Sequence, residues 1–152
     1  GITIARSKFV AFLDQDDRWR PNKLWDQATF MSENPTLQFT HTHLRYFLDC
    51  DEAPEWGTDD WLRHPAPGFT PSTLLARKTA FLELGLFRSD EESSDARWIA
   101  RAEQRGVPFE MLNQTHVERR IHDGNLDRVP KLRPESPHSI AGFTEMVHAK
   151  SA

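Results

Sequence analysis

The sequence predicts an α/β fold, because short apolar segments typical of strands alternate with amphipathic segments typical of helices along its 152 residues. The clearest pair is the apolar run at residues 9–13, followed by residues 22–33, where apolar side chains recur at helical spacing. A chain of this length forms about one domain with a sizeable core. A sheet flanked by helices is therefore the expected architecture.

The later segments continue this alternation, and glycines mark where two of the helices end. Residues 49–67 carry three prolines and no periodicity, which is typical of a long loop. Further strands are expected at residues 37–48, 68–78, 108–112 and 115–122, and helices at residues 78–84, ending at Gly85, and from Ser94 or Asp95 to Gly106.

Charge and composition exclude several classes of protein. The formal net charge is −4 with acids and bases interspersed, so no basic face for nucleic acid is expected. No apolar run approaches the length of a membrane span, which leaves at most peripheral membrane association, and residues 1–13 lack the pattern of a signal peptide. A cytoplasmic protein is expected. The single Cys50 forms no internal disulfide, and for His41 and His43 half-buried strand positions are favoured over a zinc site.

Three carboxylates, Asp14, Asp16 and Asp17, follow directly on the apolar run at residues 9–13. The carboxyl ends of strands in α/β sheets are where ligands bind. Asp14 and Asp16 lie two positions apart, so in an extended segment both side chains point to the same side and can hold one ion. Carboxylate oxygens favour Mg²⁺ or Mn²⁺, the ions that accompany phosphates. On spacing alone, a solvated turn or a helix cap is the alternative.

The string FVAFLDQDDRWRPNKL, residues 9–24, resembles the metal-site segment of glycosyltransferase family 2, whose pattern is a hydrophobic strand, Asp-x-Asp-Asp-x-Trp and then Pro-x-Lys-Leu. These are inverting enzymes of the GT-A fold. The resemblance implies that Asp14 and Asp16 form a DXD motif that holds Mn²⁺ or Mg²⁺, and that Asp17 and Trp19 bind substrate. For Trp19, a role in anchoring the loop to the core is the alternative.

The resemblance covers about residues 1–128 and implies a partial GT-A (Rossmann-like) mixed sheet flanked by helices. The N-terminal strands that hold the nucleotide in this family are expected to be missing, and the strand at residues 9–13 is expected to be central. Residues 129–152, with three prolines and little periodicity, are expected to form a C-terminal tail.

A second match concerns the helix that ends at Gly106. In the family this place reads Glu-Asp, two residues, and then a helix that contains Trp and ends in Arg-Gly, with the Asp as general base. Counting back from Trp98 places Asp95 on the base and Ser94 on the Glu. The alternative for Asp95 is a helix cap, and the acidic residues 90–92 are close enough to take its place after a small shift.

A third match is Arg120-Ile-His122-Asp-Gly-Asn125, which resembles the Arg-x-His, turn and Asn that close the family's catalytic region. It implies that His122 completes the metal environment, that Arg119 or Arg120 neutralises phosphate oxygens, and that Asn125 contacts substrate. Taken alone, a histidine beside an Asp-Gly turn is more often a polar residue at a strand end. The chain departs from the family at Leu86, where a second glycine is usual.

These matches imply metal-dependent transfer of a sugar, with inversion, from a nucleotide-sugar donor to a saccharide or other hydroxyl acceptor. The alternative is a truncated, catalytically inactive GT-A remnant that acts as a binding or self-associating module. A parallel sheet without half of its strands has an open edge that pairs with other chains. A homodimer or a complementing chain is therefore the expected protein partner.

Overall fold

A computed structural model of the chain describes residues 1–50, 62–88 and 93–122. The chain divides into two compact units, Gly1–Ile121 and His122–Ala152, and every helix and strand given below belongs to the first. The domain boundary expected at residue 128 lies outside the described residues. None of the helices in the described part has the length and apolar composition needed to cross a membrane.

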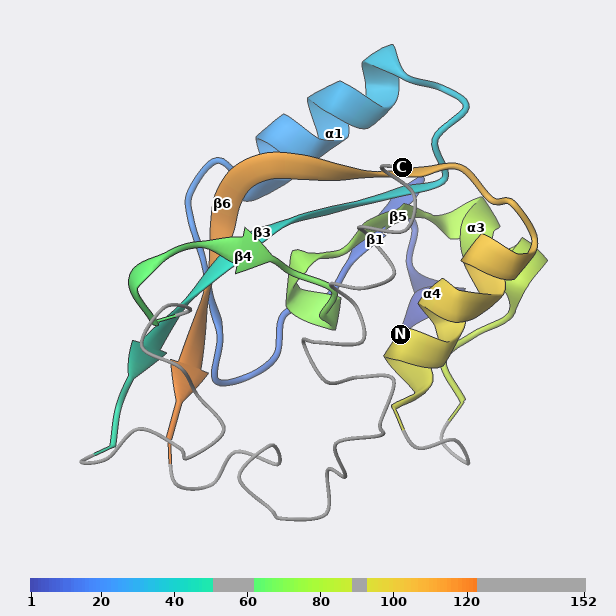
Figure 1. Ribbon diagram of the computed structural model, residues 1–152. Helices are drawn as coiled ribbons and strands as arrows, with labels where there is room; N and C mark the ends of the chain where they lie inside the picture. Colours follow the sequence, from blue (N-terminus) through green and yellow to red (C-terminus); the bar gives the residue numbers. More distant parts are fainter. Residues whose placement is uncertain (51–61, 89–92, 123–152) are drawn as a thin grey trace. The chain divides into compact units, whose positions relative to one another are not determined.

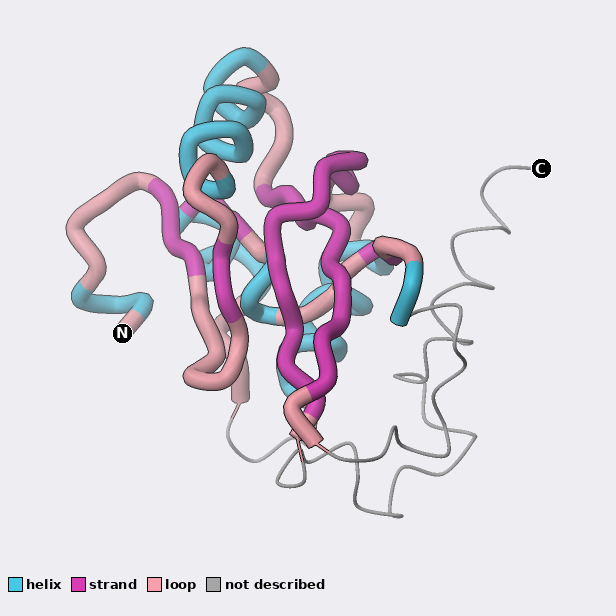
Figure 2. Tube along the Cα trace, turned by 90° about the vertical axis from the view of Figure 1, so that its left-hand side faces the viewer, coloured by secondary structure: helices cyan, strands magenta, loops and turns pink. Residues whose placement is uncertain are grey.

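A mixed sheet forms the centre of the first unit (Figure 1, Figure 2), as the α/β prediction required. Its strands lie in the order β1-β5-β3-β6-β2, with β4 beside β3. The pairing of β3 with β6 is parallel and the other pairings are antiparallel. The strands are β1 (Phe9–Ala11), β2 (Arg18–Trp19), β3 (Phe39–Leu48), β4 (Ala66–Pro67), β5 (Leu75–Arg77) and β6 (Phe109–Ile121).

The C-terminal strand corrects one prediction. β6 is a single strand where the sequence predicted two, at residues 108–112 and 115–122. The register against β3 shifts between Thr42 and His43, which leaves Asn113 and Gln114 without an opposite residue, and again between His43 and Leu44, which leaves His116 without one. Such a bulge accommodates extra residues without ending the strand. The polar residues Asn113 and Gln114 therefore suggest a turn when the sequence is considered alone, although the hydrogen-bonded pairing of β6 with β3 continues beyond them.

Three shorter strands also differ from the predictions. β2 and β4 each contain two residues and lie in segments expected to be loops. The first half of the strand predicted at residues 68–78 is instead the 3-10 turn η2 (Pro71–Thr73), and only β5 is extended. β1, expected to be central, is half-buried and pairs with β5 alone within the described residues.

The helices follow the predicted pattern closely. They are α1 (Lys23–Glu33), α3 (Lys78–Leu84) and α4 (Ser94–Gln104), and a 3-10 turn, η1 (Ile2–Ile4), precedes β1. α4 ends in a Schellman motif: Gly106, at φ 64°, donates its N–H to Glu103 O, and Val107 donates to Ala102 O. The N-cap of α4 is Ser93, so the predicted cap at Ser94 or Asp95 is wrong by a short shift.

Consecutive residues of β3 show that the helices cover both faces of the sheet. Phe39 packs against Trp98 of α4, with ring centroids 4.9 Å apart, whereas the backbone and hydroxyl oxygens of Thr40 accept hydrogen bonds from Gln27 of α1. Because neighbouring strand residues point to opposite faces, α1 and α4 lie on opposite sides of the sheet (Figure 1). The aromatic core is therefore on the α3 and α4 side, and a polar layer is on the α1 side.

Candidate functional site

The three carboxylates lie in a turn just beyond β1. The N–H of Asp17 donates to Asp14 O at 3.1 Å, and the N–H of Asp14 donates to Ser72 Oγ at 3.1 Å. Ser72 belongs to η2, so the turn is fixed to a segment far away in the sequence. Partial desolvation raises the pKa of Asp17, while its hydrogen bond to Ser72 and the charge of Arg119 oppose that rise. Asp16 and Asp17 are half-buried and Asp14 is exposed, and the hydrogen bond to Ser72 holds the turn in place.

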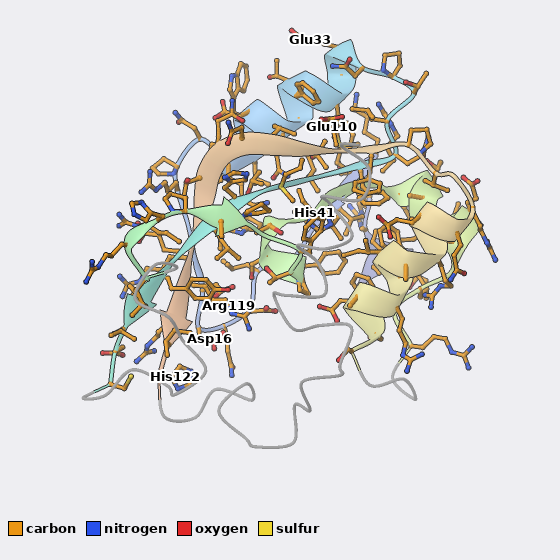
Figure 3. The ribbon with its side chains drawn as sticks, in the orientation of Figure 1. Asp16, Glu33, His41, Glu110, Arg119 and His122 are labelled. Carbon is orange, nitrogen blue, oxygen red and sulfur yellow. The ribbon has the colours of Figure 1, made fainter. Side chains whose placement is uncertain are left out.

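Charged side chains from the acidic turn, from β6 and from α4 influence the pKa of Asp14. Partial desolvation raises its pKa most, and the guanidinium of Arg119 on β6 is the largest opposing influence. The carboxylates of Asp16 and of Asp95, in the first turn of α4, also raise the pKa of Asp14. Figure 3 shows Asp16 and Arg119 at the same end of the sheet. The structure therefore brings the acidic turn, the guanidinium of Arg119 and the predicted base into one electrostatic neighbourhood.

The two adjacent arginines of β6 differ in surroundings. Arg119 is opposite Tyr46 and influences the charges of the acidic turn. Arg120 forms an ion pair with the carboxylate of Asp49, at the end of β3. Because successive strand residues point to opposite faces, the two side chains leave β6 on opposite sides of the sheet. Arg119 is the one whose charge lowers the pKa of Asp14 and Asp17 in the acidic turn.

Trp19 is anchored rather than free on the surface. Its Nε1–H donates to the backbone oxygen of Ser72 at 2.8 Å, and Lys23 Nζ lies 4.5 Å from its ring centroid. Ser72 therefore receives bonds from both ends of the segment between β1 and α1. These contacts agree with the alternative role for Trp19, which is to anchor the loop to the core. They also hold the half-buried ring beside the acidic turn.

The remaining predicted residues are placed as follows. His122 is the first residue of the second unit, and Asn125 lies outside the described residues, as do residues 90–92. His41 is buried rather than half-buried, and its Nδ1 lies 2.9 Å from Thr73 Oγ1. Burial lowers its pKa to about 3, with a further contribution from the charge of Lys23. In the described part of the chain no three His, Cys, Asp or Glu side chains gather to hold a metal.

The acidic turn nevertheless suits a cation that is shared with a phosphate. Mg²⁺ is commonly bound by one or two carboxylates together with substrate phosphates rather than by a cage made only of protein groups. Asp14 and Asp16 offer two carboxylates. Desolvation raises the pKa of Asp14 most, and the nearby carboxylates of Asp16 and Asp95 add a smaller repulsion that a cation would relieve. The residues present therefore fit Mg²⁺ or Mn²⁺ held jointly with a diphosphate.

Sequence reasoning missed a buried polar layer under the site. Lys23 is fully buried, and its Nζ donates to Gln27 Oε1 at 2.7 Å and to Leu74 O at 3.4 Å. Gln27 Nε2 in turn donates to Thr40 Oγ1 and to Thr73 O. This layer joins α1 to β3 and to η2, which carries Ser72. One feature of the sequence could have indicated this layer: Lys23 of the Pro-x-Lys-Leu pattern and Gln27 lie four positions apart, so they share one face of the helix.

Burial lowers the pKa of Lys23 to about 7, from 10.5 in the unfolded chain. Between these values the unfolded chain binds more protons, so stability rises as the pH rises above 7. We expect the free energy of unfolding to rise by about 2 kcal/mol between pH 7 and pH 9. Lys23→Met should abolish the rise, whereas Lys8→Met, at an exposed lysine, should keep it. Urea unfolding midpoints at each pH measure this, and an equal rise in both variants would contradict it.

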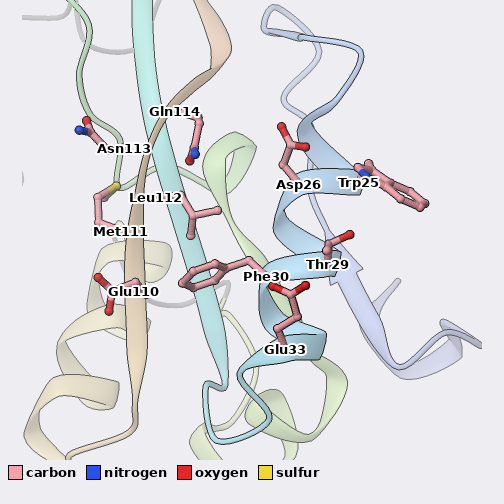
Figure 4. Close-up of a pocket in the computed structure, with 10 residues that line it drawn as sticks. All are labelled: Trp25, Asp26, Thr29, Phe30, Glu33, Glu110, Met111, Leu112, Asn113 and Gln114. Atoms are coloured by element: carbon pink, nitrogen blue, oxygen red, sulfur yellow. The ribbon is translucent and has the colours of Figure 1, made fainter.

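A pocket of about 440 Å³ lies between α1 and the first half of β6 (Figure 4). Its lining includes Trp25, Phe30 and Met111 together with the carboxylates of Glu33 and Glu110. None of the predicted site residues lines it. The candidate site is therefore the acidic turn with Arg119 and Asp95, and not this pocket.

Comparison with known proteins supports the fold. No family model matches the chain, and no curated protein matches it in sequence. A crystal structure of TarS from Staphylococcus aureus, residues 1–349, matches with a TM-score of 0.58 and 16% identity, over 78% of this chain and 37% of that one. A second TarS crystal structure matches with a TM-score of 0.58 and 15% identity, over 79% of this chain and 23% of that one.

TarS is a staphylococcal glycosyltransferase, and this chain shares the fold of the matched part of its structure. The chain spans well under half the length of either TarS structure that it matches. At these identities the similarity concerns the fold, and the chemistry has to be argued from this chain's own residues.

Proposed function

We propose that this glycosyltransferase-like fold transfers a sugar, with inversion, from a nucleotide-sugar donor to a hydroxyl acceptor. One observation carries the proposal: Asp14 and Asp16 share a turn at the end of the sheet where Arg119 of β6 lies (Figure 3), and the charges of Arg119 and of Asp95 in α4 influence the pKa of Asp14. Two carboxylates, a cation and a separate carboxylate at a helix start are the groups that this reaction needs. A likeness of fold alone does not supply them.

In the proposed reaction Asp14 and Asp16 would hold Mn²⁺ or Mg²⁺, and the bound ion would offset the charge on the leaving diphosphate. Arg119 contacts phosphate oxygens through its paired N–H groups, and Asp17 and Trp19 shape the donor site. The acceptor oxygen forms its bond to the anomeric carbon as the bond to the diphosphate breaks, and Asp95 takes the hydroxyl proton. His122 and Asn125 are proposed to complete the metal and substrate contacts.

The acceptor class follows from the same argument. A saccharide hydroxyl, or another alcohol, has a proton that only a positioned base removes at neutral pH. Asp95 lies in the first turn of α4, where the helix dipole favours its negative charge and backbone geometry restrains its position. A fixed carboxylate of this kind serves a hydroxyl acceptor.

Calorimetric titration tests the donor site. In the presence of Mn²⁺, we expect a nucleoside diphosphate, tried as UDP and GDP, to bind saturably, and Asp16→Ala to weaken that binding at least tenfold because it removes a proposed metal ligand. Glu33→Ala, which deletes an exposed carboxylate at the end of α1, is the matched control and should bind as the unchanged chain does.

Absence of heat at millimolar nucleotide would favour the alternative, a catalytically inactive module. One observation supports that alternative: within the described residues the outer edge of β1 has no partner strand. Sheet edges of this kind pair with other chains. A second copy of the chain or a complementing chain would then be the partner of this edge.

A further inference from the structure

A second pocket, of about 230 Å³, is lined by arginines that come from distant parts of the sequence. Arg20 lies just before α1, Arg45 lies on β3, and Arg63 precedes β4; we call this set the arginine pocket. Tyr46 and Thr115 add hydroxyl groups to its lining. None of the residues assigned to sugar transfer lines this pocket, so it is a separate feature of the first unit.

The charges that the structure describes at the arginine pocket favour an anion. Among the described lining residues none carries a carboxylate, although the whole chain carries a net charge of −4. The acid that the structure places against two of its arginines is Glu118, whose Oε1 lies 2.5 Å from Arg45 and 3.7 Å from Arg20. One carboxylate is therefore shared by the guanidiniums of Arg20 and Arg45, and Arg63 lines the same pocket.

The geometry of these contacts leaves hydrogen-bond donors available. Both guanidiniums approach the same oxygen of Glu118, each through its NH2 group, so neither makes a two-point pairing with the carboxylate. A guanidinium has five N–H donors, and its planar fork matches the oxygens of phosphate. The side chains of Arg20 and Arg45 are 43% and 49% exposed, so a ligand in solution can reach them.

We propose that the arginine pocket binds a phosphate group. Arg20 and Arg45 share a single carboxylate oxygen and keep further N–H donors, and a third guanidinium and hydroxyl groups lie beside them. This set of groups forms a site for a tetrahedral oxyanion rather than for a cation or an apolar ligand. Its volume is several times the roughly 30 Å³ occupied by one water molecule, which leaves room for phosphate and part of the molecule that carries it. The proposal does not depend on sugar transfer.

Amide NMR titration with inorganic phosphate, at constant ionic strength and with EDTA present, tests this site. We expect saturable shifts that include Arg45 and Thr115, and a loss of affinity of at least tenfold in Arg45→Gln/Arg63→Gln. Arg97→Gln/Arg105→Gln, the same charge change on and just beyond α4, is the matched control and should leave the affinity unchanged. Acetate at the same concentration should bind more weakly, because it lacks the third and fourth oxygens.

Glu118→Gln removes the carboxylate that competes for the arginines, and it should tighten phosphate binding several-fold. A misfolded variant would not produce such a gain, so this result separates a site from a loss of structure. The proposal is overturned if phosphate binds equally well to Arg45→Gln/Arg63→Gln, if Glu118→Gln changes nothing, or if acetate binds as tightly. Because EDTA removes metal ions, the test is independent of the acidic turn, and Asp16→Ala should bind phosphate normally.

Discussion

Asp95→Asn should lower the rate of sugar transfer by a factor of about 10² to 10⁴ while leaving the affinity for nucleoside diphosphate nearly unchanged. A general base contributes on this order to the rate, because it removes the hydroxyl proton as the new bond forms. Asparagine has almost the same shape and no basic oxygen. The α4 helix should remain intact, since its N-cap is Ser93 and its C-terminal motif lies at Gly106.

Release of nucleoside diphosphate from a panel of UDP-sugars and GDP-sugars, with Mn²⁺ present, measures the rate. Glu103→Gln makes the same change of charge in the last turn of the same helix and is the matched control. Turnover in Asp95→Asn equal to that of the control would exclude Asp95 as the base. Equal losses in rate and in nucleotide affinity would instead indicate that Asp95 supports the donor site.

Trp98→Ala should lower the free energy of unfolding by about 3 to 5 kcal/mol, the range typical of removing a large aromatic side chain from a core. Trp98 is fully buried, its ring lies 4.7 Å from that of Phe81 and 4.9 Å from that of Phe39, and its Nε1–H donates to Gly85 O. A loss of this size is a large share of the 5 to 15 kcal/mol that stabilises an ordinary domain.

The chain provides a matched control for this variant, because Trp25 on α1 is 76% exposed. Trp25→Ala should change stability by no more than about 0.5 kcal/mol, as surface substitutions usually do. Chemical unfolding monitored by circular dichroism compares the two. Similar losses in both variants would show that the packing around Trp98 is not what stabilises the fold.

The helices and the long strand β3 could be predicted because their signals are local. α3 ends before Gly85, and the apolar spacing of α1 and α4 gave their positions to within one or two residues. β2 and β4 could not be predicted, since a two-residue strand has no periodicity and exists only through its partner strand. The bulge at Asn113 could not be predicted for a related reason. A register shift depends on how two strands pair, and the sequence of one strand does not contain that information.

In the candidate site, too, the features with local sequence signals could be predicted and those that depend on distant residues could not. Asp14 and Asp16 lie two positions apart in the sequence and follow a recognisable pattern. The hydroxyl that holds their turn belongs to Ser72, 58 residues away from Asp14, and no local pattern identifies it. The choice between Arg119 and Arg120 depends on which face each one occupies, and that was fixed only when the pairing of β6 with β3 was known.

The parallel pairing of β3 with β6 has a consequence for synthesis of the protein. It joins Phe39 to Phe109, which are 70 positions apart, so β3 leaves the ribosome long before its central neighbour exists. At roughly 5 to 20 residues per second the wait lasts several seconds. Arg119 leaves the ribosome later still. The nascent chain therefore carries the acidic turn without the positive charge of the Arg119 side chain until translation of this region is almost finished.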